Sequence, residues 1–441
     1  MAPWLHYMPA EGWMNDPNGL IHWQGRHHLF YQYNPDGLEF TNQHWGHASS
    51  PDLLTWTEHE VALFPGPAPY DATACFSGCA IQHDGRVSIL YTGVRGDAQL
   101  PCLAHATDDG LSGFVKDEAN PVVAAPPAAD ITDFRDHSVW REYDGGPWRQ
   151  LVAGGRGGRG GAVFALTSPD LLTWTYDGVF VDRASAKIPG AVWECPDYFA
   201  VDDTAALLIS VIHESGDEGP GVWWLTGGIS GTTFDVRQTG VADVGDRFYA
   251  PQSYWTSDGR RIQFGWVRTH EDPAGLGGRS VGAMTLPREL SVRHGRLHCA
   301  PAAELTGLRA AATLVPPHGT ADLAGERTAG ELVLDPVAAD GVRAVVLSSP
   351  DGAKMTVDLA PFAGLDGPLR LYWDAGIVEV FRGGVAGTWS DLRITEVAEL
   401  RLDSAGQTVG GRAEIWELTR PQRLTAPAAG QPGRTVPVAA G

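Results

Sequence analysis

The chain lacks three features that would each define a class of protein. None of its 441 residues belong to an apolar run of about 18 or more, so we expect no membrane-spanning helix. Its cysteines are few, odd in number and without a CxxC pair, which argues against a disulfide framework. Basic residues are also scarce: 32 Lys and Arg against 53 Asp and Glu give a net charge of −21. This charge would repel nucleic acids and anionic membranes, so we expect neither as a partner.

The beginning of the chain, Met1-Ala2-Pro3-Trp4, holds neither a basic nor an apolar export segment. Unpaired cysteines suit a reducing compartment, so we expect a cytoplasmic protein. No phosphate loop or dinucleotide fingerprint is present, and we expect no cofactor. His44 and His47 form an HxxH pair without a third ligand, so we expect no metal. The oligomeric state stays open.

Glycine and proline, by contrast, are abundant, with 55 and 31 residues and no three-residue period. They interrupt short apolar runs about every 8–12 residues, a pattern typical of antiparallel β-structure. The clearest predicted strands are His28 to Tyr33, Val87 to Tyr91, Ala206 to Ile212 and Arg261 to Val267.

One internal repeat sets the architecture. Residues 50–57 (SPDLLTWT) return as residues 168–175, 118 positions later. If this shift spans two units of about 59 residues, the region up to about residue 290 holds about five units. The sequence therefore predicts a five-bladed β-propeller over residues 1–295.

Beyond residue 300 the sequence becomes rich in alanine and poor in tryptophan, and then shows strand-like alternation up to Leu418. We expect a β-sandwich over residues 300–425. Residues 426–441, dominated by Ala, Pro and Gly, are predicted to be a flexible tail. The predicted fold class is all-β, a five-bladed β-propeller followed by a C-terminal β-sandwich.

Three carboxylates fit equivalent positions of different blades. Asp16 lies in the turn-forming segment 15–19 (NDPNG), Asp136 follows Arg135, and Glu194 stands among apolar residues. Their intervals of 120 and 58 residues match two units and one unit of the repeat, so we expect them to meet in one central cavity. Each also has a simpler interpretation: an Asx turn, a surface ion pair and a charge at a strand edge.

Converging carboxylates are what glycoside cleavage requires: one to attack the anomeric carbon, one to protonate the leaving oxygen and a third to hold hydroxyls. Glu194, beside the apolar Trp193, suits the proton donor. Asp16, among turn residues, suits the ionised nucleophile.

These segments resemble glycoside hydrolase family 32, the β-fructofuranosidases that include invertases, inulinases and levanases. Residues 13–19 (WMNDPNG) are similar to the family's nucleophile motif, 134–136 (FRD) to its RDP element and 193–196 (WECP) to its acid/base element. Other segments that agree are 29–35, 45–48, 75–78, 246–252, 286–290 and, in the C-terminal part, 374–381.

The resemblance implies that Asp16 is the nucleophile, Glu194 the general acid/base and Asp136 the transition-state stabiliser, with retention of configuration. It also implies a fructose pocket lined by Asn15, Gln32, Trp45, Phe76, Ser77 and Arg135. For Trp45 and Phe76 a position in the core is equally open.

Two positions depart from the family pattern. His137 replaces the proline of RDP, which either alters the leaving-group subsite or is a tolerated change in a turn. Phe40 stands near a position that relatives often fill with Trp, at the wall of the leaving-group subsite.

The predicted function is cleavage of the non-reducing terminal β-D-fructofuranosyl unit of sucrose or fructans. One alternative is a fructosyltransferase that uses the same carboxylates. Another, from a different class, is a non-catalytic fructan-binding propeller, which would lack one of the three acids. The choice among sucrose, inulin-type, levan-type and phosphorylated substrates stays open.

Overall fold

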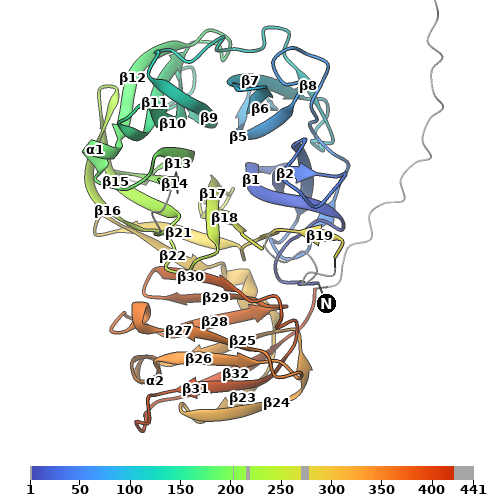
Figure 1. Ribbon diagram of the computed structural model, residues 1–441, viewed down its shortest axis with the longest axis vertical. Coiled ribbons are helices and arrows are strands. Elements are labelled where there is room, and N and C mark those ends of the chain that lie inside the picture. The colour runs from blue at the N-terminus through green and yellow to red at the C-terminus, as the bar shows by residue number, and fades with distance from the viewer. Residues whose placement is uncertain (1, 202, 215–218, 270–277, 422–441) are drawn as a thin grey trace, which may run out of the picture.

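The computed structural model describes residues 2–201, 203–214, 219–269 and 278–421. These residues form a five-bladed β-propeller, with a β-sandwich packed against one side of it (Figure 1). The all-β prediction is confirmed. The predicted tail, residues 426–441, lies outside the described residues.

Five sheets succeed one another around the propeller, each with its first strand on the central channel. Their strands are β1 (Gly12–Trp23), β2 (Arg26–Asn34), β3 (His44–Ser50) and β4 (Thr57–Glu58); β5 (Ala74–His83), β6 (Arg86–Arg95), β7 (Ala98–Ala106) and β8 (Phe114–Lys116); β9 (Ile131–Trp140), β10 (Trp148–Arg156), β11 (Gly160–Ser168) and β12 (Thr175–Asp182); β13 (Val192–Val201), β14 (Thr204–Ile212), β15 (Val222–Ser230) and β16 (Thr233–Val241); β17 (Phe248–Trp255), β18 (Arg261–Val267), β21 (Arg288–Arg293) and β22 (Arg296–Pro301).

Three short elements complete the propeller. β19 (Ser280–Val281) pairs in parallel with β1, which joins the last part of the propeller to its first blade. β20 (Ala283–Met284) pairs with β18 of the fifth blade. The helix α1 (Arg183–Ala186) follows β12 and is capped by Asp182.

The sequence repeat is a repeated turn between the third and fourth strands of the first and third blades. In both copies an aspartate, Asp52 or Asp170, accepts backbone N–H bonds from the residues two and three positions later, at 2.7 to 3.0 Å. In both, the following tryptophan donates to the carbonyl of a leucine with positive φ, 65° at Leu53 and 69° at Leu171. The shift of 118 residues therefore spans two blades, as predicted.

The sandwich consists of a six-stranded and a four-stranded sheet. The larger sheet holds β23 (Arg309–Val315), β32 (Ala413–Leu418), β25 (Ala329–Leu334), β28 (Leu369–Asp374), β29 (Ile377–Arg382) and β30 (Val385–Ser390), and the smaller one β24 (Gly319–Arg327), β31 (Val397–Asp403), β26 (Ala344–Ser348) and β27 (Lys354–Asp358). The remaining elements are α2 (Pro336–Gly341) and two 3-10 turns, Ala303–Leu308 and Ala360–Phe362.

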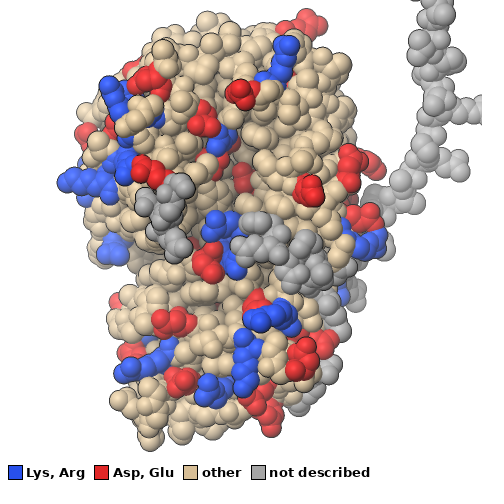
Figure 2. All heavy atoms as spheres, in the orientation of Figure 1, with Lys and Arg blue, Asp and Glu red and all other residues tan. Residues whose placement is uncertain are grey.

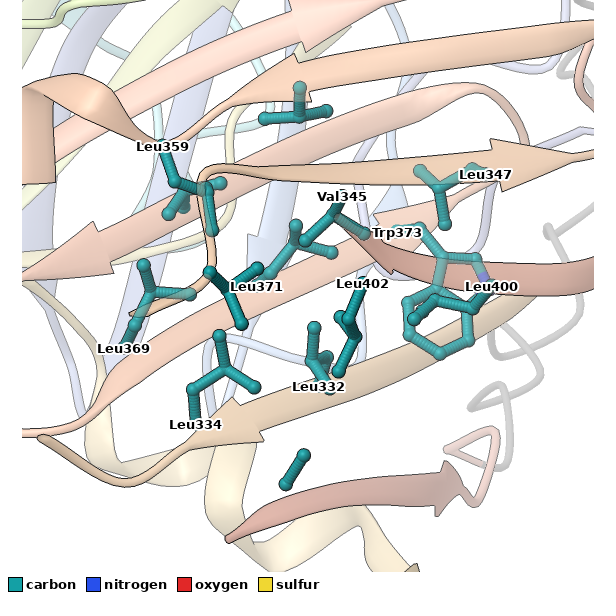
Figure 3. Packing of buried hydrophobic residues seen from close by; sticks show 14 of the residues in the cluster. Leu332, Leu334, Val345, Leu347, Leu359, Leu369, Leu371, Trp373, Leu400 and Leu402 are labelled. Carbon is teal, nitrogen blue, oxygen red and sulfur yellow. The ribbon is translucent and has the colours of Figure 1, made fainter. Parts of the chain in front are cut away.

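Alternating side chains of both sheets meet in one apolar core (Figure 3), which includes Leu332 and Leu371 of the larger sheet and Val345 and Leu400 of the smaller one. β22 ends at Pro301 and β23 begins at Arg309. The domain limits of 295 and 300 stay a prediction.

Every inner strand of the propeller has an irregular register where it lines the channel. A bulge takes residues out of the strand ladder and re-aims their side chains. The residues left unpaired are Asn15 and Asp16 in β1, Ser77 in β5, Asp136 in β9, Cys195 and Pro196 in β13, and Ala250 and Pro251 in β17. Residues at or next to all five bulges line one small pocket, among them Pro17, Ser77, Asp136, Cys195 and Ala250.

The five cysteines are all free thiols. Within the described segments, no helix has both the length and the apolar character needed to cross a membrane.

Candidate active site

Asp16, Asp136 and Glu194 come together at the channel, from the first, third and fourth blades. Their common neighbour is Cys195, the residue after Glu194. Its Sγ lies 3.5 Å from Oδ2 of Asp16 and 3.4 Å from Oδ2 of Asp136. The predicted convergence of the three acids is therefore present in the structure.

Asp16 is surrounded by hydrogen-bond donors. Ser77 Oγ donates to its Oδ2 at 2.7 Å, and Asn15 Nδ2 donates to its Oδ1 at 3.1 Å. Asn15 is itself held by Trp13, whose Nε1 donates to its Oδ1 at 2.8 Å. The sequence predicts turn residues around Asp16, whereas the partners of its side chain are Ser77, Asn15 and the Cys195 thiol.

Asp136 is the most deeply buried of the three acids, with 3% of its surface exposed. Its Oδ2 accepts the backbone N–H of Cys195 at 3.0 Å, and its own N–H donates to Thr92 Oγ1 at 3.0 Å. Its φ of 60° lies in the left-handed region, which a non-glycine residue adopts at a cost in energy. These bonds hold the residue in that conformation.

Glu194 bonds to a cation and a phenol. Arg135 donates to its Oε1 from Nε at 3.0 Å and from Nη2 at 2.8 Å, and Tyr249 OH donates to its Oε2 at 2.6 Å. Arg135 Nη1 is held in turn by Gln99 Oε1 at 2.9 Å and Asp133 Oδ1 at 3.1 Å. Arg135 therefore has a fixed position beside the acid.

The charges at this site are only partly balanced, because the site combines three carboxylates with one guanidinium. Burial and the charge of Glu194 raise the pKa of Asp16 to about 6, although the bonds from Ser77, Asn15 and Cys195 lower it. Burial and Glu194 also raise the pKa of Asp136, against the lowering effect of Arg135. Burial alone would lower the pKa of Arg135, but the carboxylates of Glu194 and Asp136 raise it, so Arg135 is charged. Figure 2 shows charged side chains of both signs near the middle of the propeller.

The other predicted pocket residues lie at two depths. Phe76 is half-buried and faces Phe40, whose ring centroid lies 5.6 Å away and which is 50% exposed. Gln32 and Trp45 are almost fully buried. Gln32 Nε2 donates to the Cys75 carbonyl at 3.0 Å, and Trp45 Nε1 donates to that of Phe76 at 3.1 Å. Trp45 is thus a core residue that supports the backbone of Phe76.

Several residues of the site were not singled out from the sequence. Tyr249 lies in segment 246–252, which resembles the family but has no predicted role for this residue, and Thr92 belongs to no motif. Gln252 spans the channel, donating to the Gly78 carbonyl at 2.8 Å and accepting the Leu20 N–H at 2.9 Å. Tyr249, Thr92 and Gln252 all lie near a bulge of an inner strand, and the sequence alone does not reveal where these bulges are. Among the described residues, no three His, Cys, Asp or Glu side chains are grouped to hold a metal ion.

Comparisons with known proteins agree with this geometry. The model of the family described as "Glycosyl hydrolases family 32 N-terminal domain" matches residues 6–301. Sucrose-6-phosphate hydrolase of Escherichia coli is 36% identical over 332 residues, which cover 70% of this chain and 66% of that protein. Raffinose invertase of Escherichia coli is 32% identical over 466 residues, covering 95% of each chain.

Among solved structures, a family 32 β-fructofuranosidase of Bombyx mori matches with a TM-score of 0.79 and 25% identity, covering 95% of this chain and 94% of that one. A variant of the same enzyme was solved in complex with sucrose. Its sequence motifs, fold and relatives together show that the chain belongs to glycoside hydrolase family 32.

Proposed function

We propose that this protein is a retaining β-fructofuranosidase that removes the non-reducing terminal β-D-fructofuranosyl unit from sucrose or short fructans. The observation that carries the proposal is the meeting of Asp16, Asp136 and Glu194 around Cys195, at the bulges of three inner strands. The names of the relatives support the substrate class: sucrose-6-phosphate hydrolase, raffinose invertase and β-fructofuranosidase.

In the first step, the carboxylate of Asp16 attacks C2 of the fructosyl unit while Glu194 gives its proton to the glycosidic oxygen. The C2–O bond breaks with its electron pair going to the leaving sugar, and a covalent fructosyl ester forms on Asp16. With its pKa near 6, Asp16 is mostly ionised at neutral pH, as a nucleophile must be.

In the second step, Glu194, now a carboxylate, takes a proton from water, and the water oxygen attacks C2. The ester bond breaks, Asp16 regains its charge, and fructose leaves with the configuration of the substrate. Arg135 and Tyr249 fix the orientation of Glu194 for both proton transfers.

Asp136, buried and tied to the Cys195 N–H, is positioned to accept hydrogen bonds from the 3- and 4-hydroxyls of fructose. Asn15, Ser77 and Phe76 complete the near wall of the pocket, with Gln32 and Trp45 as its support. The five free cysteines fit a reducing compartment, and we include a cytoplasmic location in the proposal.

The test is chromatography of the products formed from dilute and concentrated sucrose. Equal amounts of glucose and fructose at both concentrations are the expected result. Glucose in excess of fructose, with new oligosaccharides, would make the enzyme a fructosyltransferase. Inulin, levan and phosphorylated sucrose come next, and no product from any of them would contradict the proposal.

A further inference from the structure

His137 directly follows Asp136 in β9, at the position where the sequence departs from the family's RDP element. Its side chain is buried, with 2% exposed. Nε2 lies 3.1 Å from Thr92 Oγ1, and Nδ1 lies 3.0 Å from Gln150 Nε2. Burial lowers the pKa of His137 to about 3, so the ring is neutral near neutral pH and carries one proton.

The partners of the ring determine where that proton sits. In the orientation that the Gln150 amide has in the structure, its Nε2 donates to Nδ1 of His137, so the ring proton is on Nε2, and the buried Oε1 of Gln150 has no hydrogen-bond partner. Nε2–H then donates to Thr92 Oγ1. Both ring nitrogens are engaged within the protein, so neither offers a donor to a leaving group.

The Thr92 hydroxyl is fully used by this arrangement. Its oxygen accepts from His137 and from the backbone N–H of Asp136, the latter at 3.0 Å, and its proton goes to the Ser77 carbonyl at 3.0 Å. A hydroxyl has one proton to donate and two positions that accept, and all three are occupied. With His137 donating, the only acceptor left for the Thr92 proton is the carbonyl of Ser77.

The two backbone segments that Thr92 joins both lead to acids of the site. Ser77 Oγ donates to Asp16 Oδ2 at 2.7 Å, and the N–H of Asp136 belongs to a residue held at a φ of 60°. Both segments are unpaired bulges, which lack the strand ladder as an alternative support.

We propose that His137 is a positioning residue, which acts through the Thr92 hydroxyl to fix the backbone of Ser77 and of Asp136. It thereby sets the positions of the carboxylates of Asp16 and Asp136. This rests on the proposed function, in which those two carboxylates act on the fructosyl unit.

Two substitutions at His137 and one matched control test the inference. His137→Leu removes both nitrogens, and we expect kcat on sucrose to fall about 10- to 100-fold with KM changed less than about threefold, because small misplacements of reacting groups cost that much. His137→Gln keeps an N–H donor that reaches Thr92, and should restore kcat to within about fivefold of wild type. His83→Leu is the control: His83 Nε2 also contacts a hydroxyl, Ser88 Oγ at 2.9 Å, at the far end of β5, and its loss should leave kcat unchanged.

The pH profile separates positioning from stability. Asp16 faces Asn15, Ser77, Cys195 and Glu194, and it also interacts electrostatically with Asp136 and Tyr249; the Ser77 bond lowers the pKa of Asp16. Loosening Ser77 in His137→Leu should therefore move the acid limb of kcat/KM to higher pH, and His137→Gln should move it back. A lower melting temperature with kcat and the acid limb both unchanged would overturn the inference.

A measurement without substrate keeps this inference distinct from the proposed function. In protein labelled with ¹⁵N-histidine, the His137 signal, identified by its loss in His137→Gln, should show the Nε2–H tautomer and no titration between about pH 5 and 8. The Nδ1–H tautomer, or titration in that range, would overturn the role of His137 whether or not sugars are cleaved. Absence of fructose release by the wild type would overturn the proposed function and leave the tautomer result standing.

Discussion

Two buried clusters of charged groups in the described part of the molecule are built in opposite ways. The active-site cluster sets three carboxylates against the one guanidinium of Arg135. The second cluster, at the junction of propeller and sandwich, joins the carboxylates of Asp243, Asp374 and Glu379 to the cations His6 and Arg288.

In the junction cluster every carboxylate contacts a cation. Arg288, fully buried on β21, donates to Glu379 Oε2 at 2.6 and 2.9 Å and to Asp243 Oδ2 at 2.9 Å. His6 lies 3.0 Å from Asp374 and 3.1 Å from Glu379. Burial alone would raise the pKa of Glu379, but Arg288 and His6 lower it.

The difference in charge pairing distinguishes a cluster that stabilises the fold from a cluster that takes part in the reaction. Paired charges at the junction fix how the N-terminal segment, the fifth blade and the sandwich meet, and breaking such a pair leaves a buried charge uncompensated. At the active site, burial and the charge of Glu194 raise the pKa of Asp16 and of Asp136, and one guanidinium does not offset this effect. Perturbed pKa values of this kind are typical of catalytic sites. Substitutions in the junction cluster should therefore change stability, and those in the active-site cluster should change turnover.

The largest effect is expected from Asp16→Asn. An amide cannot form the ester intermediate, so kcat on sucrose should fall by at least about 10⁴-fold. The melting temperature should be equal to that of wild type or higher, because burial in the folded state disfavours the Asp16 charge. Steady-state kinetics measures the fall in kcat, and calorimetry measures the melting temperature. A folded variant with near-normal turnover would show that Asp16 is not the nucleophile.

Arg288→Met should have the reverse profile. It leaves Glu379 and Asp243 without their main cation, and we expect a loss of about 3–5 kcal/mol in the free energy of unfolding. Below the transition, kcat should stay within about twofold of wild type. Arg183→Gln, which breaks an exposed pair with Glu214, is the matched control and should cost less than about 1 kcal/mol. If both variants lost a similar free energy of unfolding, the junction cluster would have no special role in stability.

The two clusters should also weaken stability in different pH windows. Burial alone would lower the pKa of His6, but its bonds to Asp374 and Glu379 raise it to about 9. The folded state thus holds this proton more tightly, so its contribution, up to about 3 kcal/mol, is complete below about pH 6.5 and is lost as pH rises to about 9. For Asp16 the corresponding loss occurs as pH rises between about 4 and 6.

Denaturant titrations across this range measure both slopes. His6→Gln should flatten only the alkaline slope, and Asp16→Asn only the acidic one. If His6→Gln changed the acidic slope, or Asp16→Asn the alkaline slope, the two clusters would not act independently on stability.

The smallest effect is expected from Tyr249→Phe, which removes the bond of 2.6 Å to Glu194 and little else. A hydrogen bond to a charged group contributes about 1.5–3 kcal/mol, so kcat/KM should fall about 10- to 100-fold with stability nearly unchanged. An unchanged rate would mean that Arg135 alone orients Glu194.

The two clusters also differ in how far the sequence predicts them. The repeat of residues 50–57 gave the blade period, and the intervals between the three acids placed each of them on an inner strand. The Arg135–Glu194 pair and the role of Thr92 depend on bulges that bring different blades together, and the local sequence contains no signal for them. The junction cluster was not predicted. Glu379 lies in the family-like segment 374–381, but nothing in the local sequence links it to His6, which is 373 residues away.

Methanolysis of sucrose tests the central claim most directly, because a methyl fructoside, unlike free fructose, keeps the configuration in which it forms. If a fructosyl ester on Asp16 is intercepted by methanol, NMR of the product should show methyl β-D-fructofuranoside, and Asp16→Asn should form none. Formation of the α anomer, or of the β anomer at an undiminished rate by Asp16→Asn, would contradict a double displacement at this residue.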